Sequence, residues 1–212
     1  MKLKNLLGLM FLPCLFITWS NFAQRVEIDK EKLQFLSTED TINVVFTYQD
    51  LHVQLPEFTE ADFLADKRER MATVHNSEEI QDWMTEYEAA KQQLWPNQLL
   101  SILNERVQEY KNGPVFTRNA PTAAYTLTIN TYWLYFGYNV VIKKEPAQAS
   151  MTLNFHPTNY PLSTKFKTTL RRAMGLNDDS YNFEGWEEMR RMGEAYERAG
   201  YKLAKALKRV VD

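Results

Sequence analysis

Three short segments between residues 123 and 171 decide how this chain folds. They read AAYTLTINTYW (123–133), AQASMTLNFH (147–156) and LSTKFKTTLR (162–171). In each segment apolar and polar residues alternate, which is the period of a strand with one buried and one solvated face. Because turn-forming sequences join the segments, we predict an antiparallel meander against which the other elements pack.

The alternation also predicts which side chains of the meander face the core. We expect the buried face to carry Tyr125, Leu127, Ile129, Thr131 and Trp133, then Ala147, Ala149, Met151, Leu153 and Phe155, then Leu162, Thr164, Phe166, Thr168 and Leu170. The intervening residues are mostly Thr, Asn, Ser and Lys. The opposite face of the sheet is therefore expected to be wet.

One strand and two helical regions precede the meander. Residues 41–48 alternate like the meander strands and predict a first strand. Thr59 and Asn76 are capping residues, and acids follow each of them, so two helices are expected to begin there. The second helix has apolar residues three and four apart as far as Tyr110, but Pro96 is expected to divide it into two pieces.

A helix of about 25 residues is predicted after the meander, from near Glu184 to Val210. Its apolar face includes Gly193 and Gly200, and glycine weakens a helix interior. We interpret the two glycines as a close approach of the helix backbone to the sheet.

Strands and helices are grouped rather than alternating along the chain, which predicts an α+β fold. We expect an antiparallel sheet of four to five strands with helices packed on one face. The predicted organisation is a signal peptide of 1–23, a weakly ordered amino-terminal arm of 24–40, and a single α+β domain of 41–212.

The first 23 residues have the layout of a secretory signal peptide. A basic start at 1–4 is followed by the uncharged, mostly apolar run of 5–19, and Ala23 suits a signal peptidase. Export to the periplasm or the outside is therefore predicted, with cleavage after Ala23. The alternative is a retained membrane anchor, although the run is shorter than the ~20 residues that span a bilayer. Cys14 is the only cysteine, so the mature chain would be cysteine-free.

Charge and motifs exclude several classes of function. The formal net charge is −2, which argues against a nucleic-acid partner held through phosphates. His52, His75 and His156 lack neighbours with metal-ligand spacing, and we interpret them as solvent-facing or loop residues. No phosphate-binding loop or nucleophile elbow is present in the sequence. We therefore predict no metal and no cofactor.

Acidic residues gather shortly before the last helix. They are Asp178, Asp179, Glu184, Glu187 and Glu188. Such a cluster could supply paired carboxylates for acid–base hydrolysis, and this is our alternative function. The same residues also suit capping and the positive end of a helix dipole.

The run from 132 to 138 holds more aromatic residues than one sheet face requires. It supplies our candidate binding surface, formed by Tyr132, Trp133, Tyr135, Phe136 and Tyr138. An exposed aromatic patch would mark a contact site for a protein, glycan or lipid surface. The alternative is that helices cover these rings.

The layout of signal peptide, mixed sheet and long final helix, ending Ala204-Lys205-Ala206-Leu207-Lys208, loosely resembles small periplasmic accessory domains such as the amino-terminal α/β domain of TolB-like proteins. No functional residue is transferred from that resemblance. We predict an exported, non-enzymatic binding or envelope-assembly module with an envelope protein or glycan as partner and no transmembrane span after signal cleavage.

Overall fold

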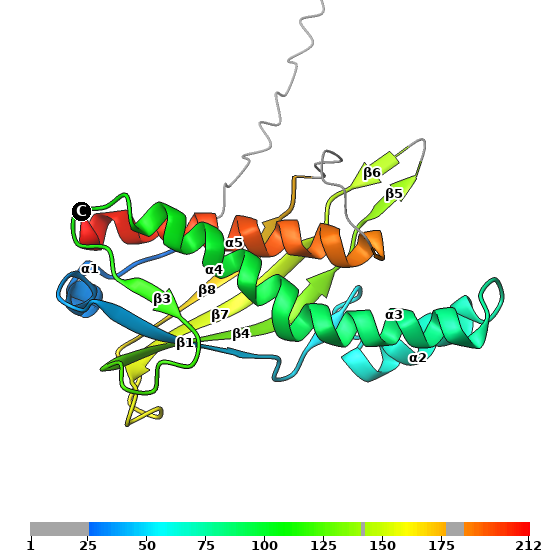
Figure 1. The fold of residues 1–212 in the computed structure, drawn as a ribbon, viewed down its shortest axis with the longest axis horizontal. Coiled ribbons are helices and arrows are strands. Elements are labelled where there is room, and N and C mark those ends of the chain that lie inside the picture. Colours follow the sequence, from blue (N-terminus) through cyan, green and yellow to red (C-terminus); the bar gives the residue numbers. More distant parts are fainter. Residues whose placement is uncertain (1–25, 141–142, 177–184) are drawn as a thin grey trace, which may run out of the picture.

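The computed structural model describes residues 26–140, 143–176 and 185–212, and it shows an α+β fold (Figure 1). The helices are α1 (Lys30–Leu33), α2 (Glu60–Met71), α3 (Ser77–Ala89), α4 (Trp95–Val107) and α5 (Glu187–Val211), with a 3-10 turn η1 (Gln34–Ser37) and a π-helical segment η2 (Ala90–Leu94). The main sheet contains β1 (Thr41–Thr47), β2 (His52–Val53), β3 (Val115–Thr117), β4 (Tyr125–Tyr135), β7 (Gln148–Pro157) and β8 (Phe166–Met174). A separate hairpin is formed by β5 (Tyr138–Val140) and β6 (Lys143–Glu145).

The six-stranded sheet is mostly antiparallel but not entirely so. Its order is β3-β1-β4-β7-β8, and β2 also pairs with β4. The predicted meander is confirmed in its antiparallel pairing of β4, β7 and β8. Its third strand begins only at Phe166, and Leu162 and Thr164, which were predicted to face the core, are exposed. However, β1 runs parallel to both β3 and β4, which corrects the expectation of an antiparallel sheet. The helices α2, α3 and α4 act as the long crossover that parallel neighbours require.

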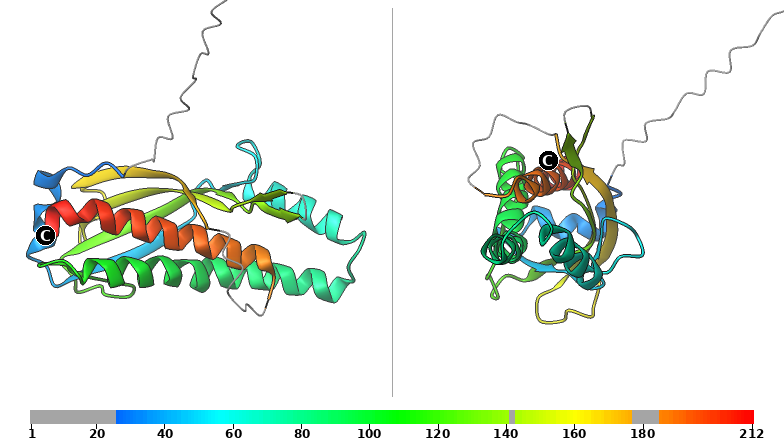
Figure 2. Two further views of the ribbon diagram at one scale, coloured as in Figure 1. Left: turned by 90° about the horizontal axis from the view of Figure 1, so that it is seen from above. Right: turned by 90° about the vertical axis from the view of Figure 1, so that its right-hand side faces the viewer.

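One face of the sheet is covered by α4 and α5, as predicted (Figure 2). The core residues Ile42, Leu153 and Leu203 are fully buried between the layers. On the opposite face Val45 is 41% exposed, in agreement with a solvated sheet surface. The hairpin of α2 and α3 instead extends beyond the end of the sheet (Figure 1).

A β-bulge in β4 and another in β8 change the predicted orientation of the strand ends. Thr131 pairs with Met151 but Trp133 pairs with Ser150, so Tyr132 is an extra residue in β4. Beyond this bulge Leu134 is fully buried and Trp133 lies on the open face, which corrects the prediction that Trp133 faces the core. A bulge reverses the alternation because side chains of a strand have a period of two.

The second helical region consists of two α-helices, as predicted, and α4 begins at Trp95 with Pro96 in its first turn. The π-helical segment η2 joins α3 to α4, and the N–H of Trp95 donates to the carbonyl of Ala90. The wider turn leaves the Lys91 carbonyl free, and it accepts a hydrogen bond from Tyr48 Oη at 2.5 Å. Pro96 has no N–H and therefore cannot donate a hydrogen bond to the Gln92 carbonyl four positions earlier. That carbonyl instead accepts a hydrogen bond from Arg118 Nη1 at 3.0 Å.

The two glycines of α5 mark a close approach to α4 rather than to the sheet. A Cβ at Gly193 would lie 1.8 Å from the side chain of Gln98, and a Cβ at Gly200 would lie 2.4 Å from the carbonyl oxygen of Leu99. Both distances are below contact distance. The Gln98 side chain can move aside, but the Leu99 carbonyl is part of the α4 backbone, so a larger residue at Gly200 would push the helices apart. This corrects the partner that we predicted for the glycines.

The segment predicted as a weakly ordered arm is packed against the domain over its described part, from residue 26. Asp29 caps α1 by accepting hydrogen bonds from the N–H groups of Glu31 and Lys32. Leu33 and Leu36 are fully buried in the main core. Because charged residues surround these two leucines in the sequence, the segment does not show the regular apolar pattern of a packed element.

Candidate functional site

The structure separates the five aromatic residues of the candidate binding surface. Phe136 is only 2% exposed, whereas Tyr132, Trp133, Tyr135 and Tyr138 are partly exposed. The rings of Trp133 and Tyr135 are parallel within 3°, with centroids 6.0 Å apart. One ring of the run is thus covered, as in one alternative, and the other four are partly exposed, closer to the other alternative.

Phe136 is part of a buried aromatic cluster at the base of the α2–α3 hairpin. Its ring centroid lies 5.7 Å from that of Phe63, 6.1 Å from Trp95 and 6.3 Å from Tyr87. Trp83 stacks on Tyr87 at 5.5 Å with an angle of 8° between the rings. We call these five residues the aromatic core.

An ion pair closes the aromatic core on the side of α5. Lys67 Nζ lies 2.8 Å from Glu188 Oε1, and the indole N–H of Trp83 donates to Glu188 Oε2 at 2.6 Å. The Lys67 ammonium also lies 4.8 Å above the centre of the Trp83 ring. One carboxylate therefore fixes a cation and a ring together, in a charge-assisted arrangement.

A second ion pair repeats the same arrangement next to Tyr87. Tyr87 Oη donates to Glu60 Oε1 at 2.6 Å, and Lys91 Nζ lies 2.7 Å from the same oxygen. Burial, followed by the charge of Glu60, raises the pKa of Tyr87 above its ordinary value. Burial also raises the pKa of Tyr196 to about 12. These hydroxyls therefore stay neutral and act as structural donors rather than as general bases.

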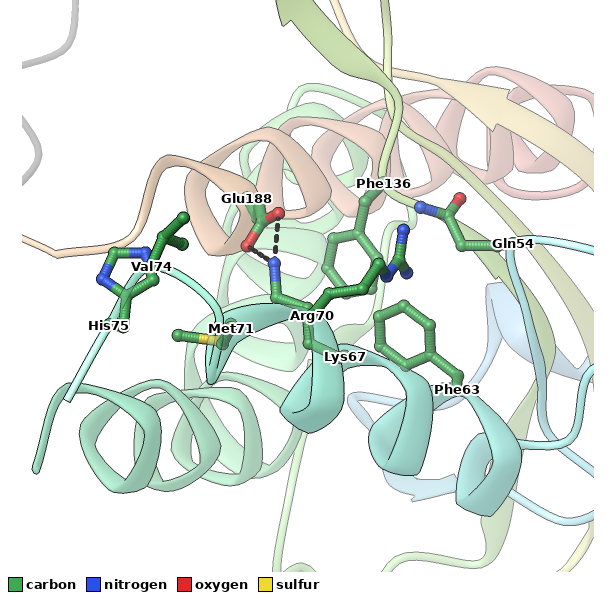
Figure 3. A pocket seen from close by; sticks show the side chains of 9 residues that line it. All are labelled: Gln54, Phe63, Lys67, Arg70, Met71, Val74, His75, Phe136 and Glu188. Carbon is green, nitrogen blue, oxygen red and sulfur yellow. Dashed lines mark hydrogen bonds and ion pairs between the residues drawn. The ribbon is translucent and has the colours of Figure 1, made fainter. Parts of the chain in front are cut away.

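Two connected hollows lie over the aromatic core. The first, which we call the hairpin groove, has a volume of about 490 Å³ and is lined by Leu55, Phe58, Phe63, Arg70, Tyr135 and Tyr138, among others. The second is a cavity of about 270 Å³ that shares Gln54, Phe63 and Arg70 with the groove and reaches Glu188 (Figure 3). An ion pair between Arg70 and Asp66 lies in the wall of the groove.

A third hollow lies on the open face of the sheet, beside the bulges. We call it the bulge pocket, and it has a volume of about 490 Å³. Its lining includes His52, Tyr132, Trp133, Ser150, Arg171 and Arg172. The stack of Trp133 on Tyr135 connects it to the hairpin groove. The four partly exposed members of the aromatic run are therefore divided between two neighbouring hollows.

Ser150, Arg171 and Arg172 are not among the site residues predicted from the sequence. Their signal was present, because two adjacent arginines break the alternation at the end of β8. The structure shows the reason: Ala149 pairs with Ala173 and Met151 with Leu170, so that Ser150 opposes two residues. A break in period beside an otherwise regular strand indicates a bulge.

The three histidines do not meet. His52 Nδ1 lies 3.0 Å from the Asp50 carbonyl, and His75 Nδ1 lies 3.2 Å from Glu79. His156 is buried, with Nε2 3.0 Å from Thr128 Oγ1, which corrects its expected solvent-facing or loop position. Within the described residues no group of three or more His, Cys, Asp or Glu side chains could hold a metal ion.

The predicted acidic cluster is described only in part. Asp178, Asp179 and Glu184 lie outside the described residues. Glu187 is paired with Arg191 at 3.3 Å, and Glu188 is the carboxylate that closes the aromatic core. The two described acids thus make structural ion pairs.

Comparison with known proteins does not assign the chain to a family. No protein-family model matches it, and no significant match is found among curated proteins. Among the helices that the structure describes, none has the length and apolar character needed to cross a membrane.

Proposed function

We propose that this protein is an exported, non-enzymatic binding or envelope-assembly module that holds its partner in the hairpin groove. The observation that carries the proposal is the division of the aromatic run. Phe136 is buried and holds the fold, while Tyr135 and Tyr138 line an open groove. Exposed rings beside a hollow are typical of a contact site, because they offer a large apolar area with a polar tip.

The lining of the groove favours binding over catalysis. Its walls are mainly rings and aliphatic side chains, and Leu55 is 51% exposed at its edge. The charged groups Arg70 and Asp66 are paired with each other. The described lining holds a single carboxylate, Asp66, and so lacks the paired carboxylates of acid–base hydrolysis. An envelope protein with an apolar or aromatic segment fits this lining.

Export is part of the proposal and rests on the amino-acid sequence. The predicted signal peptide of 1–23 lies outside the described residues. The loose resemblance in layout to periplasmic accessory domains supports the same location. Amino-terminal sequencing of the mature protein tests it, with Gln24 as the expected first residue.

Affinity capture from the native envelope, with the mature protein as bait, tests the groove. The double variant Tyr135→Ser/Tyr138→Ser is expected to lose the captured partner while its thermal stability stays nearly unchanged. Phe136 is left intact because it is buried. The matched control is Tyr160→Ser, which removes a 70% exposed tyrosine from the turn between β7 and β8.

Equal capture by the double variant and by the wild-type protein would contradict the proposed site. Loss of stability without a binding defect would contradict it as well, because the rings would then serve the fold.

A further inference from the structure

The bulge pocket is built by two bulges that meet on the same residue of the central strand. Ser150 pairs with Trp133 on one side, next to the extra residue Tyr132. On its other side Ser150 opposes Arg171 and Arg172, and its hydroxyl oxygen accepts the N–H of Arg172 at 2.9 Å. Arg172 has a φ of 46°, a backbone conformation that costs energy for a non-glycine residue. Bulges re-aim side chains, and here they direct two rings and two guanidinium groups to one place.

The charge of the pocket is positive and uncompensated. Arg171 and Arg172 are both exposed, and neither makes an ion pair within the residues that the structure describes. Its described lining also includes His52 but neither Asp nor Glu. The Arg172 guanidinium lies 5.7 Å from the centre of the Trp133 ring, which holds it over the pocket. A ligand with negative charge is the complement of this surface.

The accessible donors of the pocket are the two guanidinium groups. Arg171 and Arg172 are exposed and line the pocket, whereas the indole nitrogen of Trp133 is buried and out of reach of a ligand. A guanidinium group has five N–H donors and no acceptor. The ligand must therefore supply acceptors.

We propose that the bulge pocket binds an anionic saccharide, one that carries carboxylate or sulfate groups. The guanidinium groups match such anions in a two-pronged geometry. The partly exposed ring of Tyr132 suits the C–H surface of a sugar ring, because the face of an aromatic ring is negative, whereas the Trp133 ring already contacts Tyr135 and Arg172. Sugar hydroxyls and the ring oxygen are further acceptors for the guanidinium groups. This deepens the proposed function, since it names the ligand chemistry of one part of the binding surface.

An acidic peptide fits the pocket less well. A peptide held on a sheet gains affinity by pairing with a free strand edge, but the pocket lies over β4, β7 and β8, on the inner side of β8, and the free edge is the outer side of that strand. The only aliphatic group in the described lining is Pro56, so side-chain pockets are lacking as well. Side-chain donors and ring faces remain, and these recognise sugars.

The test measures binding of the mature protein to immobilised polymers. Alginate and polygalacturonate present carboxylates, dextran sulfate presents sulfate esters, and dextran is the neutral reference. We expect salt-sensitive binding to the carboxylated polymers, to dextran sulfate, or to both, and none to dextran. The two anionic arms identify which group is recognised. Poly-glutamate is the peptide comparison, and equal or tighter binding to it would overturn the saccharide class.

Variants separate the pocket from diffuse charge attraction. Arg171→Gln with Arg172→Asn is expected to weaken binding by about ten-fold or more, because two charge-assisted contacts are lost. Asn is chosen at 172 because it tolerates a positive φ. The matched control is Lys165→Gln with Lys167→Gln, which removes the same charge from exposed residues in and next to the same strand. Trp133→Leu removes the ring that contacts the Arg172 guanidinium, and it is expected to weaken binding several-fold.

Failure to bind any anionic polysaccharide, or equal weakening by the lysine control, overturns the inference. The groove variant Tyr135→Ser/Tyr138→Ser separates the two proposals. If saccharide binding is absent while this variant still loses its captured partner, only the present inference fails. If saccharide binding depends on the arginines but the groove variant captures its partner normally, only the groove fails.

Discussion

The two ends of the molecule are packed in different ways. Between the sheet and the helices α4 and α5, the core is mostly aliphatic, as at Leu127, Leu153 and Leu203. Under the α2–α3 hairpin, which extends past the sheet, the core is aromatic and is closed by two Lys–Glu pairs. The difference shows how a helical hairpin without a sheet beneath it is held. Large rings fill the space. Each of two glutamates accepts a hydrogen bond from a ring and also pairs with a lysine.

This comparison explains why one aromatic run serves two purposes. Phe136 belongs to the aromatic core, while Tyr135, one position earlier, lines the groove on the other side of the strand. Side chains of a strand alternate between faces, so neighbours in sequence reach different environments. Each of the following changes tests one side of the division.

The largest loss of stability is expected for Phe136→Ala. Removal of a fully buried phenylalanine leaves a cavity and lowers the free energy of unfolding by about 3–5 kcal/mol. Tyr135→Ser should cost less than about 1 kcal/mol, because partly exposed positions contribute little. Urea unfolding followed by tryptophan fluorescence measures both. Similar losses for the two variants would contradict the division.

Glu188→Leu is expected to cost about 1–3 kcal/mol, because it leaves the Lys67 ammonium and the Trp83 N–H without an acceptor. The comparison variant is Glu109→Gln, which breaks the exposed pair with Arg106 and should cost about 0–0.5 kcal/mol. Thermal and urea unfolding of both variants give the difference. If the two substitutions cost the same, the ion pair does not close the aromatic core.

Tyr48→Phe tests the junction between the two ends, at the π-helical segment. It removes the hydroxyl that donates to the Lys91 carbonyl and is expected to cost about 1 kcal/mol. Tyr160→Phe, at an exposed tyrosine far along the chain, should have no measurable effect on urea unfolding. An unchanged midpoint for Tyr48→Phe would show that water replaces the hydroxyl at this carbonyl.

The smallest effect concerns the tip of the α2–α3 hairpin and depends on pH. The N–H of Asn76 donates to Glu79, and this hydrogen bond, helped by His75, lowers the pKa of Glu79 below its ordinary value of 4.5. A lowered pKa of an acid stabilises the fold above 4.5, and that stabilisation is lost as pH falls through the folded-state pKa. Glu79→Gln should therefore be less stable than wild type at pH 7, and the gap should close toward pH 3. A gap that is constant with pH would contradict this assignment.

Local patterns in the sequence predict the elements better than their arrangement. The alternation in residues 147–156 identified the buried face of β7, and Thr59 and Asn76 marked the starts of α2 and α3. These features depend on neighbouring residues alone. The parallel pairing of β1 could not be predicted, because strand direction is set by the path of the intervening helices.

The candidate site was predictable only in its aromatic part. The excess of rings in 132–138 pointed to the correct stretch, but a single extra residue at Tyr132 decides which rings face solvent. The partner of Lys67 is Glu188, which lies 121 positions along the chain. No local pattern connects residues at that separation, so the closure of the aromatic core needed the structure.

Site-specific photo-crosslinking tests the proposed binding site most directly. A photoreactive benzoylphenylalanine replaces Tyr135 in the full-length protein, which is then irradiated in the native envelope. The account predicts a discrete crosslinked adduct at position 135 and none when the same group replaces the exposed Tyr160. No adduct at 135, or equal adducts at both positions, would contradict the claim that the hairpin groove holds the partner.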